Sequence, residues 1–175
     1  HLPIDSHLGY LQKHAFCKPQ IAAQPHPELS MVVVVVYHDD FTILDCLKEI
    51  SCIDLPEMGA IEVIAVSGTT EGEFKEKFIL NSKTHLDIQK WAKNQGAGDQ
   101  RFYSIYVPDL PAKHAGWGLL MKIGMDEAVQ RFQRAHQEDG IILVLDADKI
   151  CPFGILYEVQ EYFRDHPKVD SLGIE

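Results

Sequence analysis

The sequence predicts an α/β fold, a three-layer sandwich in which helices cover both faces of an open, mostly parallel sheet. Three observations predict it. Residues 31–37 form an apolar, β-branched run, which is typical of a central parallel strand buried on both faces. Further strand patterns at 61–66, 102–107 and 141–145 alternate with helical patterns along the chain. The length of 175 residues is that of one domain with a real core.

The remaining elements complete this order. A helix over residues 5–16 and a proline-rich linker are expected to form an accessory segment, 1–30, in front of the main domain, 31–175. The helices expected in the main domain cover residues 43–50, 71–80, 84–94, 116–137 and 152–163. Residues 169–175 have the pattern of a further strand running off the end, so we expect a piece of a longer protein, truncated at its carboxyl end.

Composition narrows the class of partner. The net charge is −10, and the 16 lysines and arginines form no cluster longer than a pair, which argues against nucleic-acid binding. An acidic protein that binds a polyphosphate must offset like charges, and a bound divalent cation does so. No apolar run reaches the ~20 residues that span a bilayer. The four cysteines lack CxxC spacing, so we expect a cytoplasmic location, either free or peripheral to the inner face of the membrane.

Polar residues follow three of the expected strands, at 37–40, 67–70 and 146–148. In open parallel sheets, ligands bind beyond the carboxyl ends of the strands. Asp146 and Asp148 stand one residue apart and can direct carboxylate oxygens toward one point, which suits Mg²⁺ or Mn²⁺. On spacing alone, a solvated turn whose aspartates cap the next helix fits equally well.

Four segments in chain order resemble the family 2 glycosyltransferases of the GT-A fold. Residues 33–40 and 61–72 are similar to the first two strands of that family with their polar endings. Residues 116–124 are similar to a segment that follows later in the family, and 142–148 to its metal-binding strand and Asp-x-Asp turn. The resemblance covers residues 31–175. It implies a GT-A nucleotide-diphospho-sugar transferase fold.

The resemblance also implies a nucleotide-sugar site. Tyr37 and Asp39 would line the nucleobase pocket, with much of the contact coming from the backbone. Ser67 and Gly68 would face the base or the ribose. The family usually has an aspartate where this chain has Ser67, and a neutral hydroxyl should hold the base less strongly.

The diphosphate side of the site follows from the later segments. By the resemblance, Lys122 would lie near the diphosphate, Asp146 would contact the ribose or the metal, and Asp148 would ligate the metal, Mn²⁺ or Mg²⁺. The ion would stabilise the negative charge that grows on the leaving nucleoside diphosphate.

The expected function is transfer of a hexose-type sugar from a nucleotide-sugar donor to a saccharide or lipid-linked acceptor. Members of the family mostly invert the anomeric centre, which needs a general base. That base is expected beyond residue 175. Two alternatives stay open: a non-catalytic nucleotide or nucleotide-sugar binding module, and a sugar-phosphate nucleotidyltransferase. The latter would want a glycine-rich loop with a basic residue where this chain has His38, Asp39 and Asp40.

Overall fold

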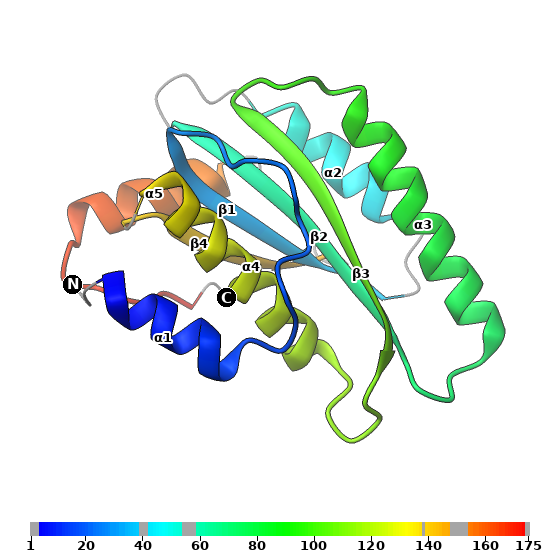
Figure 1. Ribbon diagram of the computed structural model, residues 1–175. Coiled ribbons are helices and arrows are strands. Elements are labelled where there is room, and N and C mark those ends of the chain that lie inside the picture. Colours follow the sequence, from blue (N-terminus) through cyan, green and yellow to red (C-terminus); the bar gives the residue numbers. More distant parts are fainter. Residues whose placement is uncertain (1–3, 39–41, 54–58, 138, 148–153, 174–175) are drawn as a thin grey trace.

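The computed structural model describes residues 4–38, 42–53, 59–137, 139–147 and 154–173 (Figure 1). The elements in chain order are α1 (Ile4–His14), β1 (Leu29–Val36), α2 (Ile43–Ser51), β2 (Ala60–Thr70), α3 (Lys75–Lys93), β3 (Gln100–Leu110), α4 (Trp117–Ala135), β4 (Ile141–Asp146) and α5 (Ile155–Asp165). No described helix is long and apolar enough to cross a membrane.

The described strands form one open, all-parallel sheet in the order β3-β2-β1-β4. Helices α2, α3 and α5 cover one face, which we call the α3 face, and α4 covers the other, the α4 face. Figure 1 shows α3 and α4 on opposite sides of the sheet. The α/β prediction with an open parallel sheet and helices on both faces is confirmed.

Strand β1 occupies the centre because its side chains suit burial on both faces. Residues 31–36 are all fully buried. Val33 and Val35 pack on the α3 face, whereas Val34 and Val36 pack on the α4 face. Successive residues of a strand point to opposite faces, so an unbroken apolar run fits only a strand covered on both sides.

Two sequence-based element predictions were wrong. The two helices expected at 71–80 and 84–94 are one helix, α3, because no glycine or proline separates them and Asn81, between them, is buried against the sheet. The strand expected from residue 169 is absent over residues 169–173 of the described chain. Leu172 is 40% exposed there, so this segment has too little buried apolar surface to hold it in a sheet.

The segment expected to be a linker is attached along α4. Glu127 accepts hydrogen bonds from the main-chain N–H of Gln20 at 2.7 Å and of Ile21 at 3.3 Å. The Arg131 guanidinium donates to the carbonyl oxygen of Ala23 at 2.9 Å. The Ile21 side chain is buried with the apolar residues of the α4 face. The segment therefore packs as part of the layer that α4 forms, and β1 begins at its end.

Candidate functional site

The register of the strands places three of the predicted site residues on neighbouring strands. Val36 of β1 pairs with Val66 of β2 and with Asp146 of β4. The Tyr37 N–H donates to the Val66 carbonyl at 3.0 Å, so Tyr37 and Ser67 lie side by side. Tyr37 follows β1 and Asp146 ends β4, so both lie at the carboxyl edge. Ser67 lies within β2, which runs on to Thr70 and pairs Ser67 with Tyr106, so the expected strand end at residue 66 was wrong.

These residues do not all face the same way. Tyr37 packs on the α3 face, and Ser67 follows the alternation of Ala65 onto that face. Leu145 and Ala147 also contact the α3 face, so the intervening Asp146 side chain points to the α4 face. A ligand that touches all three must lie across the end of the sheet.

The hydroxyls of Tyr37 and Ser67 are sealed in the protein. Both residues are 0% exposed, and neither hydroxyl has a hydrogen-bond partner within the described part of the chain. Burial raises the pKa of the Tyr37 phenol, while the nearby Ser67 and Ser104 hydroxyls oppose that shift without reaching hydrogen-bond geometry. A buried unsatisfied polar group costs about 1–3 kcal/mol. In this state, neither the main chain nor the side chain of these two residues is accessible to a ligand.

A polar cluster lies near Tyr37 and Ser67, and the sequence analysis missed it. His85 Nδ1 lies 2.8 Å from Ser104 Oγ, and Thr69 Oγ1 lies 2.9 Å from the Tyr106 hydroxyl. Burial lowers the pKa of His85, which favours its neutral form. The cluster joins α3 to β2 and β3 through neutral hydrogen bonds.

A signal for this cluster was present in the sequence. Phe102, Ser104 and Tyr106 are spaced two residues apart along β3, so all three side chains point to the same face of the sheet. His85 precedes the fully buried Ile88 by three residues on α3, which is one helical turn. These spacings place the residues on facing surfaces, but pairing them requires the sheet register.

Gly68 has a structural reason to be glycine. A Cβ added there would lie 2.7 Å from the Val107 carbonyl oxygen and 2.7 Å from Leu110 Cδ1. The close approach of β2 to β3 therefore excludes a side chain. The predicted contact of Gly68 with a base or ribose stays a prediction.

An acid–base pair links the ends of β1 and β2. Glu73 accepts a hydrogen bond from the Thr70 N–H at 2.6 Å, and its other oxygen lies 3.7 Å from His38 Nε2. The side chains of His38 and Glu73 are 34% and 21% exposed, so both reach solvent at the carboxyl edge. The pair adds an ionisable group beside the predicted site.

Lys122 is engaged elsewhere. Its ammonium lies 2.6 Å from an Asp126 carboxylate oxygen and 3.4 Å from the Tyr10 hydroxyl of α1. Burial is the largest single influence and opposes the charged form, but Asp126 and Tyr10 together outweigh it and raise the pKa of Lys122. The lysine is therefore charged, and it contacts these two groups rather than Tyr37, Ser67 or Asp146.

The predicted metal site is described only in part. Asp39 and Asp148 lie outside the described residues, and so does the expected helix start at Pro152. Within the described ranges, no group of three or more histidine, cysteine, aspartate or glutamate side chains could hold an ion. Asp146 supplies hard carboxylate oxygens at the strand end, which suit Mn²⁺ or Mg²⁺.

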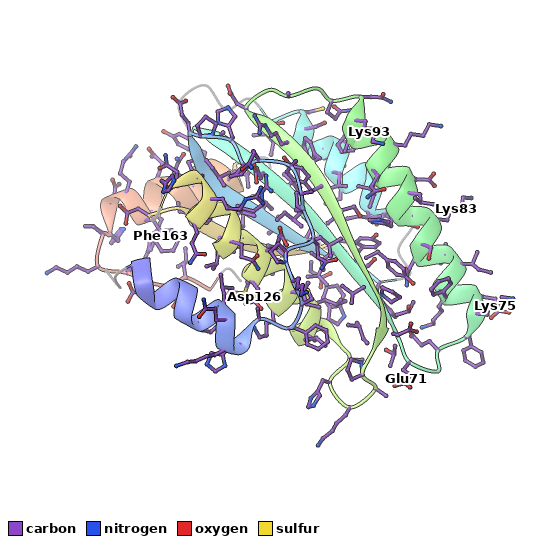
Figure 2. All side chains as sticks on the ribbon, viewed as in Figure 1. Glu71, Lys75, Lys83, Lys93, Asp126 and Phe163 are labelled. Atoms are coloured by element: carbon purple, nitrogen blue, oxygen red, sulfur yellow. The ribbon has the colours of Figure 1, made fainter. Side chains whose placement is uncertain are left out.

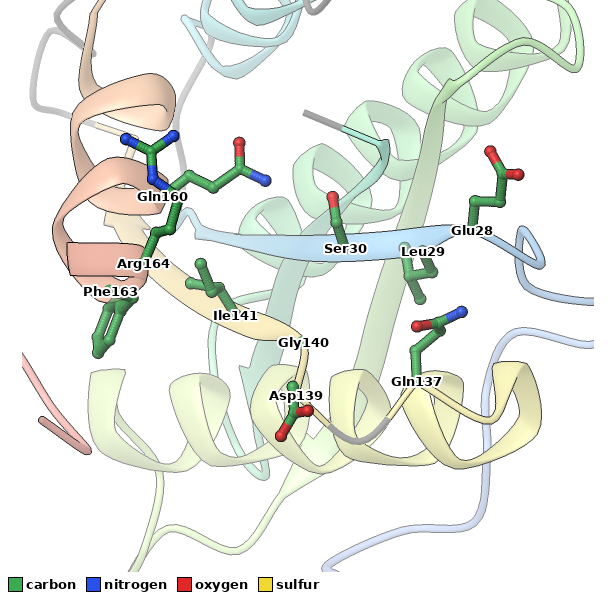
Figure 3. Close-up of a pocket in the computed structure, with 10 residues that line it drawn as sticks. All are labelled: Glu28, Leu29, Ser30, Gln137, Asp139, Gly140, Ile141, Gln160, Phe163 and Arg164. Carbon is green, nitrogen blue, oxygen red and sulfur yellow. The ribbon is translucent and has the colours of Figure 1, made fainter. Parts of the chain in front are cut away.

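A described cavity of about 430 Å³ lies at the other edge of the sheet (Figure 3). Glu28 and Ser30 at the start of β1, Ile141 at the start of β4 and Arg164 of α5 line it. These positions are the amino ends of the strands. The cavity is thus separate from the carboxyl edge, where the predicted site lies.

Comparisons of the chain with protein-family models, with curated proteins and with solved structures found no match. The family resemblance therefore rests on the four sequence segments alone.

Proposed function

We propose that this chain is the nucleotide-sugar-binding part of a metal-assisted, inverting glycosyltransferase of the GT-A type. It would move a hexose-type sugar from a nucleotide-diphosphate donor to a saccharide or lipid-linked acceptor. The observation that supports this proposal is the convergence of Tyr37, Ser67 and Asp146 on neighbouring parallel strands. Tyr37 and Asp146 lie at the strand ends, where open α/β sheets bind ligands, and Ser67 lies beside Tyr37 within β2.

The proposed roles are those that the family resemblance implies. The ends of β1 and β2, with Tyr37, Asp39, Ser67 and Gly68, would hold the nucleobase and ribose mainly through main-chain groups. Because Tyr37 and Ser67 are fully buried, such contact would require the residues that cover them to move aside. A role for Lys122 at the diphosphate would require it to exchange Asp126 and Tyr10 for the ligand.

Asp146 and Asp148 would hold Mn²⁺ or Mg²⁺. When bound, the ion would offset the diphosphate charge and stabilise the leaving group. This matters in a protein of net charge −10, whose own carboxylates would otherwise repel a diphosphate. We assign no described carboxylate as the general base.

A nucleotide-binding module without turnover is the second candidate. The buried hydroxyls of Tyr37 and Ser67 favour it, because a site that withholds these hydroxyls has fewer groups with which to orient a sugar for reaction. A transfer assay on the longest natural form of the protein separates the two. Release of free nucleoside diphosphate together with a glycosylated acceptor occurs only for the enzyme.

The decisive test of the metal assignment is a single amide substitution. Titration calorimetry with UDP, GDP, CDP, ADP and dTDP should find one preferred nucleotide that binds in the presence of Mn²⁺. Asp148→Asn should weaken that binding at least about tenfold, which is about 1.4 kcal/mol. The control is Asp170→Asn, which removes one charge from an exposed residue on the tail after α5. Unchanged affinity in Asp148→Asn would show that the aspartate pair does not hold the ion.

A further inference from the structure

The outer face of α3 carries an unusual stripe of side chains. Lys75, Ile79, Lys83, Leu86, Lys90 and Lys93 follow one another at steps of four, four, three, four and three residues. This spacing of three and four residues places them on one side of a helix. All six are exposed. We call this set the α3 stripe.

The α3 stripe points away from the protein. On the opposite side of the helix, Asn81 and Ile88 are buried, and the ring of Trp91 packs against Phe102 of β3 with ring centroids 4.8 Å apart. Figure 2 shows Lys75, Lys83 and Lys93 along the outer side of α3, away from the sheet. The packed side fixes the rotation of α3, so the stripe is presented as one surface.

The apolar residues at the stripe are well exposed to solvent. Among the described large hydrophobic residues, the three most exposed are Phe74 at 77%, Leu86 at 61% and Ile79 at 55%. Leu86 and Ile79 lie in the stripe, and Phe74 directly precedes it. Single exposed apolar residues are common, but a cluster on one element marks an interaction surface.

The charge of the stripe is opposite to that of the whole chain. Its four charged residues are all lysines, although the chain has 26 acidic and 16 basic residues. None of these four lysines forms an ion pair with any residue that the structure describes. The surface therefore combines lysines that form no ion pair with exposed aliphatic side chains, and the exposed Asp87 lies one helical turn from Lys83 and Lys90.

We propose that the α3 stripe docks on an anionic lipid bilayer, with the helix lying in the plane of the membrane surface. Ile79, Leu86 and Phe74 would enter the headgroup region, while the lysines, whose long stems can lie along apolar surface, would contact lipid phosphates. Anionic lipids attract basic segments in this way. A nucleic acid would attract the lysines but would leave the aliphatic side chains exposed. This docking is independent of sugar transfer.

Sedimentation with lipid vesicles tests the proposal. The protein should bind vesicles of phosphatidylcholine mixed with phosphatidylglycerol and should not bind phosphatidylcholine alone. Lys83→Glu with Lys90→Glu should reduce binding about tenfold or more. Lys13→Glu with Lys168→Glu changes the net charge by the same amount at exposed lysines outside α3, and should leave binding within about twofold.

A second double variant separates lipid from a mere polyanion. Ile79→Ser with Leu86→Ser keeps every charge and alters only exposed side chains, so the fold should persist, which circular dichroism and the unfolding midpoint verify. Vesicle binding should fall about tenfold, because the apolar side chains that enter the headgroup region are lost. No binding of the wild type to anionic vesicles, an equal loss in the Lys13 and Lys168 variant, or full binding after loss of the two aliphatic side chains would each overturn the proposal.

Discussion

At the scale of single residues, the most consequential contact is the buried ion pair between Arg131 and Glu62. Both side chains are 0% exposed, and the guanidinium reaches both carboxylate oxygens of Glu62. Its other partners are the Ala23 carbonyl and the ring of Tyr103, whose centroid lies 4.6 Å away. Burial opposes the charge, but Glu62 outweighs burial and raises the pKa of Arg131, so the guanidinium stays charged.

Breaking this pair from one side should be costly. Arg131→Met leaves the Glu62 carboxylate buried without its partner, and we expect a loss of about 3–5 kcal/mol in the free energy of unfolding. Denaturant-induced unfolding measures it. The double variant with Glu62→Leu should recover part of the loss, because no uncompensated charge remains. A single variant as stable as the wild type would show that the carboxylate is not sealed as described.

At the scale of elements, the fit of α4 on the sheet depends on one glycine. A Cβ added at Gly124 would lie 2.3 Å from Val34 Cγ1 and 3.1 Å from Val66 Cγ2. Both valines are buried strand residues with stiff χ1 angles, so neither can move aside cheaply. The absence of a side chain at this position lets α4 lie close to β1 and β2.

Gly124→Ala therefore sets two effects against each other. Alanine gains up to about 1 kcal/mol in helix propensity over glycine. Overpacking of a filled core costs about 1–3 kcal/mol, so we expect a net loss of stability by thermal unfolding. Gly118→Ala is the matched control in the same helix, since nothing lies within 4 Å of the added Cβ, and it should be neutral or stabilising. If the two variants gave the same midpoint, the close approach would not be real.

The sequence predicted most elements because their signals are local. The β-branched run of β1 and the apolar spacing of α2 and α4 depend on neighbours in the chain. The attachment of the proline-rich segment does not depend on neighbours in the chain. Glu127, Arg131 and Arg134 share one side of α4, but they bind main-chain atoms about a hundred residues earlier, which no local pattern encodes. For the same reason the His85–Ser104 contact was missed.

At the scale of the whole molecule, the parallel sheet brings motifs that are far apart in the sequence onto neighbouring strands. Residues 37, 67 and 146 are far apart in sequence, and only the strand order β3-β2-β1-β4 makes their strands neighbours. The family resemblance predicts Tyr37, Ser67 and Asp146 in one site, and the structure places them on neighbouring strands. It did not anticipate that Tyr37 and Ser67 would be sealed, because burial depends on how helices cover the sheet.

The most direct test of the central claim is the thermal unfolding midpoint in the presence of nucleoside diphosphates with and without Mn²⁺. A ligand that binds only the folded state raises the midpoint according to its affinity. We predict a rise with at least one nucleotide when Mn²⁺ is present, and its loss when EDTA removes the ion. No rise with any nucleotide, or an equal rise without metal, would contradict a cation-mediated nucleotide site at the carboxyl edge of the sheet.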